Sequence, residues 1–335
     1  MNPIRFDHVE HLCDHRGIFE HAEYTSPREE HGYCTDDNAR LLVVTSREDD
    51  DGSPYRLSRV ALGFVLDAQS SQGQSRNRMD RHGNWTDGFT TDDCWGRSLW
   101  GLGSAAAHHT DHSIRHWALR GFDLGVTQRS RSPRAMAFAA LGAADVVEHH
   151  PFHAPARALL ADALTVIGPI PPGAWSWPER RLRYANAAVA EAVIAAGAAL
   201  DSALDLDRGL AMLSWLLERE LETGSGHLSV VGVEGRGPGE TGPRFDQQPI
   251  EAAAMADACW RAYDVTGCRS WLRGVSAAAA WFAGVNDAGL VMHDAASGGG
   301  FDGLHADSVN LNQGAESTLA FISTMQRARS LAVAA

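Results

Sequence analysis

The stretch Gly32–Leu42, "GYCTDDNARLL", joins a polar cluster directly to an apolar run. Two adjacent carboxylates, Asp36 and Asp37, are followed by an amide and then by Arg40. The small and aliphatic residues that follow have the spacing of a helix that is buried on most sides. The stretch therefore predicts a buried helix whose first turn carries acidic and basic side chains.

The same arrangement recurs about six times along the chain. Each copy starts with a polar or acidic cluster and continues into small apolar residues, and more charged helices with one apolar face lie between the copies. The predicted buried helices lie at residues 35–46, 91–107, 132–147, 182–200, 246–263 and 312–328. The predicted one-sided helices lie at residues 55–69, 113–126, 154–167, 206–221 and 270–285, and a sixth is expected near residues 8–22.

Alternation of this kind is typical of repeated helical hairpins. Six hairpins closed into a ring would form an all-α (α/α)6 toroid, in which the inner helices are packed on nearly all sides. An open solenoid would give a similar pattern, but the chain length suits one ring and neither end resembles a polar capping repeat. We therefore predict a single (α/α)6-toroid domain over residues 1–335.

Composition excludes several classes of protein. The chain of 335 residues has a formal net charge of −13, so it is poorly suited to nucleic acid or to an anionic membrane. No apolar run could span a bilayer, the N-terminal segment has no apolar signal core, and the five cysteines are scattered, so we expect a cytoplasmic protein with reduced thiols. The sequence contains no lysine, which excludes Schiff-base chemistry, and we predict neither a cofactor nor a metal. The oligomeric state is left open.

Ring closure would bring the polar clusters together around one cavity, because each cluster begins a buried helix. There the helix N-terminus and Arg40 would stabilise the charges of Asp36 and Asp37. The alternative is that Thr35 or Asp36 merely caps its helix. The segment Thr90–Arg97, "TTDDCWGR", repeats the pattern with a tryptophan and an arginine that capping does not explain, which favours the cavity.

Long loops rich in aromatic residues and glycine precede several of these helices. Aromatic rings beside carboxylates and amides suit carbohydrate binding, since sugar C–H faces stack on rings and hydroxyls need hydrogen-bonding partners. We therefore predict a site for a small-molecule or oligosaccharide substrate. Its predicted binding residues are Asp36, Asp37, Asn38, Arg40, Trp95, Arg97, Trp177, Tyr184, Asn186, Gln247, Gln248, Glu251, Asp302, Asn312, Gln313 and Glu316.

Cleavage of a glycosidic bond needs two carboxyl groups, one to protonate the leaving oxygen and one to activate water or attack carbon. Glu179, in the loop "WSWPE", lies in an apolar setting that favours the protonated acid. Asp93 and Asp246 open predicted buried helices and are better placed to stay ionised as the partner carboxylate. We predict an inverting reaction, because a helical ring would spread its carboxyl groups across a wide cavity.

Several of these motifs resemble those of a bacterial family of (α/α)6-toroid, glycosidase-like proteins, whose members occur alone or fused to glycosyltransferase domains. The resemblance spans about Phe19 to Phe321 and implies the toroid fold and a carbohydrate context, without a catalytic assignment. The motifs that carry it are "GYCTDDNARLL", "DDCWGRSLWGLG", "WPERRLRYANA", "FDQQPIEAAAMADA", "GGGFDGL" and "NQGAESTLAF".

Three readings of the function remain open at this stage. The first is glycosidic cleavage by water, or by phosphate if Arg40, Arg97 and Arg183 form an anion site. The second is a sugar epimerase or isomerase, which usually needs histidine acid and base groups. The third is a non-catalytic glycan-binding partner of a glycosyltransferase. The histidines in suitable loops are His227, His293 and His305.

Overall fold

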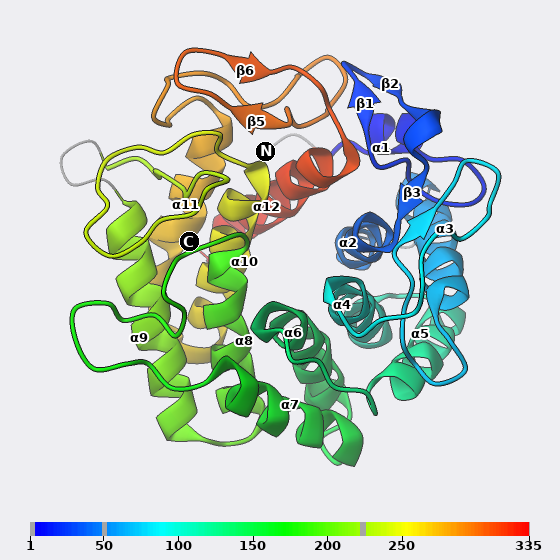
Figure 1. Ribbon diagram of the computed structural model, residues 1–335, viewed down its shortest axis with the longest axis horizontal. Coiled ribbons are helices and arrows are strands. Elements are labelled where there is room, and N and C mark those ends of the chain that lie inside the picture. The colour runs from blue at the N-terminus through cyan, green and yellow to red at the C-terminus, as the bar shows by residue number, and fades with distance from the viewer. Residues whose placement is uncertain (1–3, 49–51, 222–225, 335) are drawn as a thin grey trace.

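Helices that are buried along most of their length form the inner wall of a ring (Figure 1). Each inner helix packs against the next one in the chain, and the last packs against the first, so the ring is closed. The all-α (α/α)6 toroid expected from the sequence is therefore confirmed. In the computed structural model, which describes residues 4–48, 52–221 and 226–334, the inner helices are α2 (Thr35–Thr45), α4 (Asp93–His108), α6 (Pro133–His149), α8 (Asn186–Ala199), α10 (Pro249–Thr266) and α12 (Ala315–Ala334).

The outer helices bury only one face, as their amphipathic sequences indicate. In α9, for example, Met212, Leu213, Leu216 and Leu217 are buried, and they recur three to four residues apart. The outer layer consists of α1 (Asp7–Leu12), α3 (Gly52–Ala68), α5 (His112–Gly125), α7 (Ala154–Ile167), α9 (Ala203–Glu220) and α11 (Leu272–Phe282).

The helix expected near residues 8–22 is much shorter than predicted. It ends at Leu12, because the Asp14 side chain accepts hydrogen bonds from the backbone N–H groups of Arg16 and Gly17 and closes a turn. The rest of the segment, including Glu20, does not continue the helix and can therefore extend toward the ring axis.

Small residues let the inner helices approach one another closely. A Cβ atom at Gly142 of α6 would lie 2.0 Å from the backbone oxygen of Leu99 in α4. A Cβ atom at Gly103 of α4 would lie 2.2 Å from the backbone oxygen of Gly142. The alanine- and glycine-rich composition of these segments is thus a packing requirement of the inner ring.

The loops contain short strands, and in the described residues these form only two-stranded sheets. In the described ranges they form three antiparallel pairs, two residues to a strand: β1 (Ala22–Glu23) with β2 (Ser26–Pro27), β3 (Tyr33–Cys34) with β4 (Arg78–Met79), and β5 (Gly303–Leu304) with β6 (Val309–Asn310). Two 3-10 turns lie at Glu29–His31 and Arg269–Trp271. Within the part of the chain that the structure describes, none of the helices combines the length and apolarity needed to cross a membrane.

The inner helices all run in the same direction along the ring axis. Residues from the first turns of α2, α4, α10 and α12 line one cavity at the end that carries the long loops. Residues near their other ends form a buried ionic network, in which Arg47 and Arg327 pair with Asp257 and Arg261 pairs with Asp145. The two ends of the ring are therefore chemically distinct.

Candidate functional site

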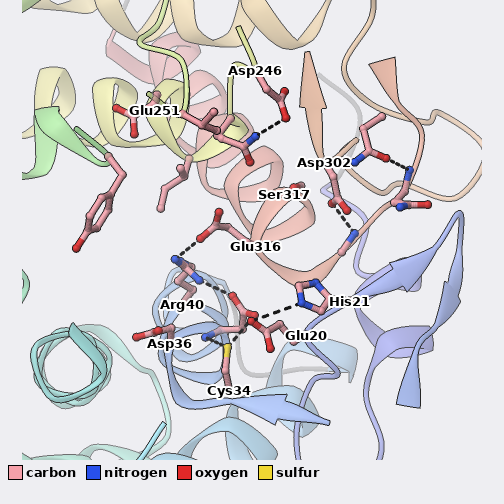
Figure 2. A pocket seen from close by; sticks show the side chains of 18 of the residues that line it. Glu20, His21, Cys34, Asp36, Arg40, Asp246, Glu251, Asp302, Glu316 and Ser317 are labelled. Carbon is pink, nitrogen blue, oxygen red and sulfur yellow. Dashed lines mark hydrogen bonds and ion pairs between the residues drawn. The ribbon is translucent and has the colours of Figure 1, made fainter. Parts of the chain in front are cut away.

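A cavity of about 960 Å³ opens at the end of the ring where the inner helices begin. Its lining combines residues from those helices with residues from the loops above them (Figure 2). Most of the polar residues singled out in the sequence meet here. The predicted site residues in the lining are Asp36, Asp37, Arg40, Asp93, Arg97, Tyr184, Asp246, Gln248, Glu251, Asp302, Asn312 and Glu316.

The start of α2 frees its acidic side chains for the cavity. The N-cap is Cys34, whose sulfur accepts a hydrogen bond from the backbone N–H of Asp37, so neither Thr35 nor Asp36 caps this helix. Asp36 instead lies with its Oδ1 atom 3.6 Å from the Nε atom of Arg97 on α4. The paired aspartates therefore belong to the cavity and are not used as helix caps.

Arg40 is a buried cation held between two carboxylates, Asp37 of its own helix and Glu316 of α12. Figure 2 shows the pair that Arg40 forms with Glu316. Burial raises the pKa of Asp37 to about 6, although the Arg40 guanidinium opposes this effect. The side chain of Glu316 is 40% exposed, so it faces the cavity while Asp37 lies behind it. The triad thus ties α2 to α12 at the floor of the cavity.

Asp246 has one carboxylate oxygen without a hydrogen-bonding partner among the described residues. Its Oδ2 atom accepts a hydrogen bond from Gln248, drawn as a dashed line in Figure 2, whereas Oδ1 is buried and accepts no hydrogen bond. Burial raises the pKa of this carboxyl, against the lowering effect of His305, whose Nδ1 atom lies 3.8 Å away. A Cβ atom at Gly303 would lie 2.4 Å from Oδ1, so the glycine leaves room for this carboxyl.

Asp93 occupies the first position of α4, where the helix N-terminus favours a negative charge. Its Oδ2 atom accepts a hydrogen bond of 2.6 Å from the Tyr184 hydroxyl. Tyr184 is the only phenylalanine, tyrosine or tryptophan among the described lining residues. It is therefore the one ring of this kind in the lining on which a sugar could stack.

Glu251 is a buried carboxylate at the edge of the cavity, near the start of α10. Burial raises its pKa to about 7, against the backbone N–H groups of Ala185 and Asn186 that donate to it. Because these bonds use both carboxylate oxygens, Glu251 connects α10 to the loop before α8.

Glu179 does not fit the predicted role of general acid, and this expectation is corrected. It is absent from the described lining, and its carboxylate forms an ion pair of 2.5 Å with Arg134 of α6. The two tryptophans expected to bind sugar are also elsewhere. Trp95 is buried and donates a hydrogen bond to the backbone of α5, and Trp177 is buried in a stack with Trp215. Both rings are used in packing between helices, because they are the largest apolar surfaces available.

Four predicted amide ligands also lie outside the described lining, because each is used to hold the chain in place. Asn38 and Asn186 are fully buried and bond to backbone groups beside the starts of their own helices. Gln247 is fully buried and links Trp281 to a neighbouring loop. Gln313 is 3% exposed and bonds within its own loop. Buried amides must find such partners, which leaves them unavailable to a ligand.

Several lining residues were missed at the level of sequence. Glu20 and His21 lie in a segment predicted as helix, and His31 and Arg78 come from loops without a recognisable pattern. Arg134 is not in the described lining, but it bonds to the backbone of Tyr184 and does carry a signal, since an arginine in an alanine-rich buried helix needs a carboxylate partner. The histidines proposed from sequence are not in the described lining: His227, His293 and His305.

Among the residues that the structure describes, two groups of side chains have the spacing of metal ligands. Glu20, Cys34 and Asp37 offer atoms within 4.8 Å of one another, and so do His108, Asp145 and Glu148 at the opposite end. In the first group, Arg78 pairs with Glu20 and Arg40 pairs with Asp37, while burial raises the pKa of the Cys34 thiol well above its ordinary value. In the second group, Asp145 is already paired with Arg261. In each group, at least one carboxylate is therefore engaged by an arginine.

Comparison with known proteins supports the fold. No family model matches the sequence, and no curated protein matches it. The solved cellobiose 2-epimerase of Spirochaeta thermophila has a TM-score of 0.69 at 12% identity, covering 98% of this chain and 94% of that chain. A D-mannose isomerase has a TM-score of 0.67 at 10% identity, covering 97% and 96%. An inactive α-1,6-mannanase variant of Salegentibacter sp., bound to α-1,6-mannotetrose, has a TM-score of 0.61 at 13% identity, covering 96% and 95%. At these identities the likeness shows the fold alone: the chain shares the (α/α)6 toroid with these enzymes.

Proposed function

We propose that this protein is a carbohydrate-active enzyme that hydrolyses a glycosidic bond in the cavity, with Asp246 as general acid and Asp93 as the partner carboxylate. The observation that carries the proposal is the unpaired, buried Oδ1 atom of Asp246 at a carboxyl whose pKa is raised. A raised pKa favours the protonated form of this carboxyl, which is the form that delivers a proton to a leaving oxygen.

The ring geometry supports Asp93 as the partner. Asp246 directly precedes α10 and Asp93 begins α4, and these helices are three positions apart in a ring of six inner helices, hence on opposite sides (Figure 1). Carboxyl groups that face each other across a wide cavity leave room for a water molecule, which is the arrangement of inverting enzymes at separations of roughly 6.5–9.5 Å. Asp93 would then accept the proton of that water.

Known neighbours add support for a role of the paired aspartates. The inactive mannanase variant has alanine in place of two consecutive aspartates. In this chain, the consecutive aspartates Asp36–Asp37 and Asp92–Asp93 each lie at the start of an inner helix.

The charge of the cavity favours a neutral glycan and water over phosphate. The described lining residues include nine carboxyl groups and six arginines. Five of those arginines already pair with carboxylates, including Arg40 and Arg97, and only Arg183 lacks a side-chain partner among the described residues. A phosphate ion would therefore meet a surplus of negative charge and one unpaired cation.

The test starts from a screen of 4-nitrophenyl glycosides and unmodified oligosaccharides, with proton NMR to read the anomer first released. Asp246→Asn should lower kcat on unmodified glycans by about 10²–10⁴ and spare 4-nitrophenyl glycosides, whose leaving group needs little protonation. The exposed Asp162→Asn on α7 serves as the control and should keep full activity. Equal loss on both substrate types, or retention of the anomeric configuration, would count against the assignment.

A second candidate is a sugar epimerase or isomerase. His21 and His31 both line the cavity, with ring centroids 5.1 Å apart in an edge-to-face contact, and the neighbours include enzymes of both kinds. Such an enzyme would exchange the C2 hydrogen of a free reducing sugar with deuterium oxide, whereas a hydrolase would not. Glycan binding without either reaction would indicate a non-catalytic module.

A further inference from the structure

The backbone immediately before α8 is strained. Ala185 has φ 47° and ψ 44°, the left-handed region that favours glycine. A residue with a side chain holds this conformation only where its surroundings fix it, and such residues gather at functional sites. Ala185 follows Tyr184, so its conformation sets the direction of the one tyrosine ring in the cavity lining.

Glu251 fixes this turn from the side of α10. Its carboxylate accepts hydrogen bonds from the backbone N–H of Ala185 and, at 3.3 Å, from that of Asn186. The Asn186 side chain donates a further bond of 3.2 Å to the same carboxylate. Since Glu251 is 4% exposed, these three donors face little competition from water.

Arg134 fixes the same turn from the side of α6. Its Nε atom donates a hydrogen bond of 2.7 Å to the backbone oxygen of Tyr184, and its Nη2 atom donates one of 3.2 Å to Asn186. Its guanidinium also lies 4.8 Å from the centre of the Tyr184 ring. Glu179 completes the arrangement by pairing with Arg134, which is 3% exposed.

We propose that Arg134 and Glu251 clamp the turn at Ala185 and thereby aim the Tyr184 hydroxyl at Asp93, so that Tyr184 is a positioning residue for the partner carboxylate. The hydrogen bond of 2.6 Å from Tyr184 to Asp93 is the product of this clamp. The catalytic consequence rests on the proposed function of Asp93, but the geometric one does not.

The experiment first weakens the clamp with a substitution at Glu251. It then replaces Ala185 by glycine, which adopts the left-handed conformation without a clamp. Glu251→Gln replaces one of the two acceptor oxygens by an amide NH₂ group, so the side chain can no longer accept the two backbone bonds on separate oxygens. We expect kcat on the best 4-nitrophenyl glycoside to fall roughly 5- to 30-fold with little change in KM, the equilibrium cost of holding alanine left-handed. Ala185→Gly should restore most of this loss in the double variant, because glycine adopts the conformation freely.

The matched control is Asp201→Gly. Asp201 is also left-handed, with φ 56°, but it lies beyond the other end of α8, so it should not rescue Glu251→Gln. Crystal structures of the single and double variants read the Tyr184–Asp93 hydrogen bond directly, and they decide the proposal even if the protein hydrolyses no glycoside. If Glu251→Gln does not fold, Arg134→Lys replaces it, with the same rescue expected. The proposal is wrong if the Glu251→Gln variant keeps both the Tyr184–Asp93 hydrogen bond and full kcat. It is also wrong if Ala185→Gly and Asp201→Gly rescue that variant equally.

Discussion

Glu251 should make the stability of this protein depend on pH in a defined window. The residue is buried, and its pKa is raised from an ordinary 4.5 to about 7. A carboxyl with a higher pKa in the folded state binds its proton more tightly there, so its contribution to stability is full below pH 4.5 and is lost as the pH rises through about 7. The difference between 4.5 and about 7 corresponds to about 3 kcal/mol.

The perturbation is Glu251→Gln, which mimics the protonated acid and cannot ionise. The free energy of unfolding of the variant minus that of the wild type should therefore rise by about 3 kcal/mol between pH 4.5 and pH 7.5. The weakened clamp on Ala185 does not reverse this trend. Other buried carboxyls, such as Asp37, titrate in both proteins and cancel in the difference.

The assay is differential scanning calorimetry at half-unit steps from pH 4 to pH 8. Glu218→Gln, the same substitution at an exposed position of α9, is the control and should show no trend in its Tm difference from the wild type. The reasoning is refuted if the Tm difference between Glu251→Gln and the wild type stays constant across this range, or if it falls as the pH rises.

Two further experiments use thermal denaturation: the first tests the charged residues at the floor of the cavity, and the second tests the packing of the inner helices. Arg40→Met should destabilise the fold by about 3–5 kcal/mol because it leaves Asp37 buried without its partner, and Asp37→Asn in the same chain should recover part of the loss. Glu316→Gln should cost only about 0–1 kcal/mol, since that side chain is 40% exposed, and equal costs for the two single variants would contradict this account. Gly142→Ala should destabilise by about 1–3 kcal/mol although alanine favours a helix, because its Cβ would meet the backbone of α4. Gly63→Ala, on the outer helix α3 with open space around it, is the control and should be neutral or stabilising; a loss there as large as at Gly142 would show that packing is not the cause.

The helices were predictable because their signal is local. Alternating buried and one-sided patterns identify inner and outer helices, and the small residues of segments such as Pro133–His149 already indicate close approach on several sides. The failure near residues 8–22 has an equally local cause, since the Asp14 side chain competes for backbone donors and ends α1 at Leu12.

The site was predictable where residues sit at the start of an inner helix. Asp37, Arg40 and Asp93 reach the cavity because the helix on which they lie decides their position. Loop residues carry no such constraint, so the direction of Glu179 depends on Arg134, which is 45 residues away in the sequence. For the same reason, the sequence did not reveal that the Trp177 side chain is buried within the protein and does not face a ligand.

The sequence by itself determined the all-helical ring and the end at which its charges gather, because helical periodicity and the position of a side chain within a helix are properties of neighbouring residues. Only the tertiary structure decided which of those charges remain available. Asp246 lines the cavity and keeps one carboxylate oxygen without a hydrogen bond, whereas Glu179 pairs with Arg134 outside the described lining and Glu251 accepts a hydrogen bond from the backbone of Ala185. That outcome depends on which groups distant segments bring within hydrogen-bonding distance, because burial makes an unpaired polar group costly.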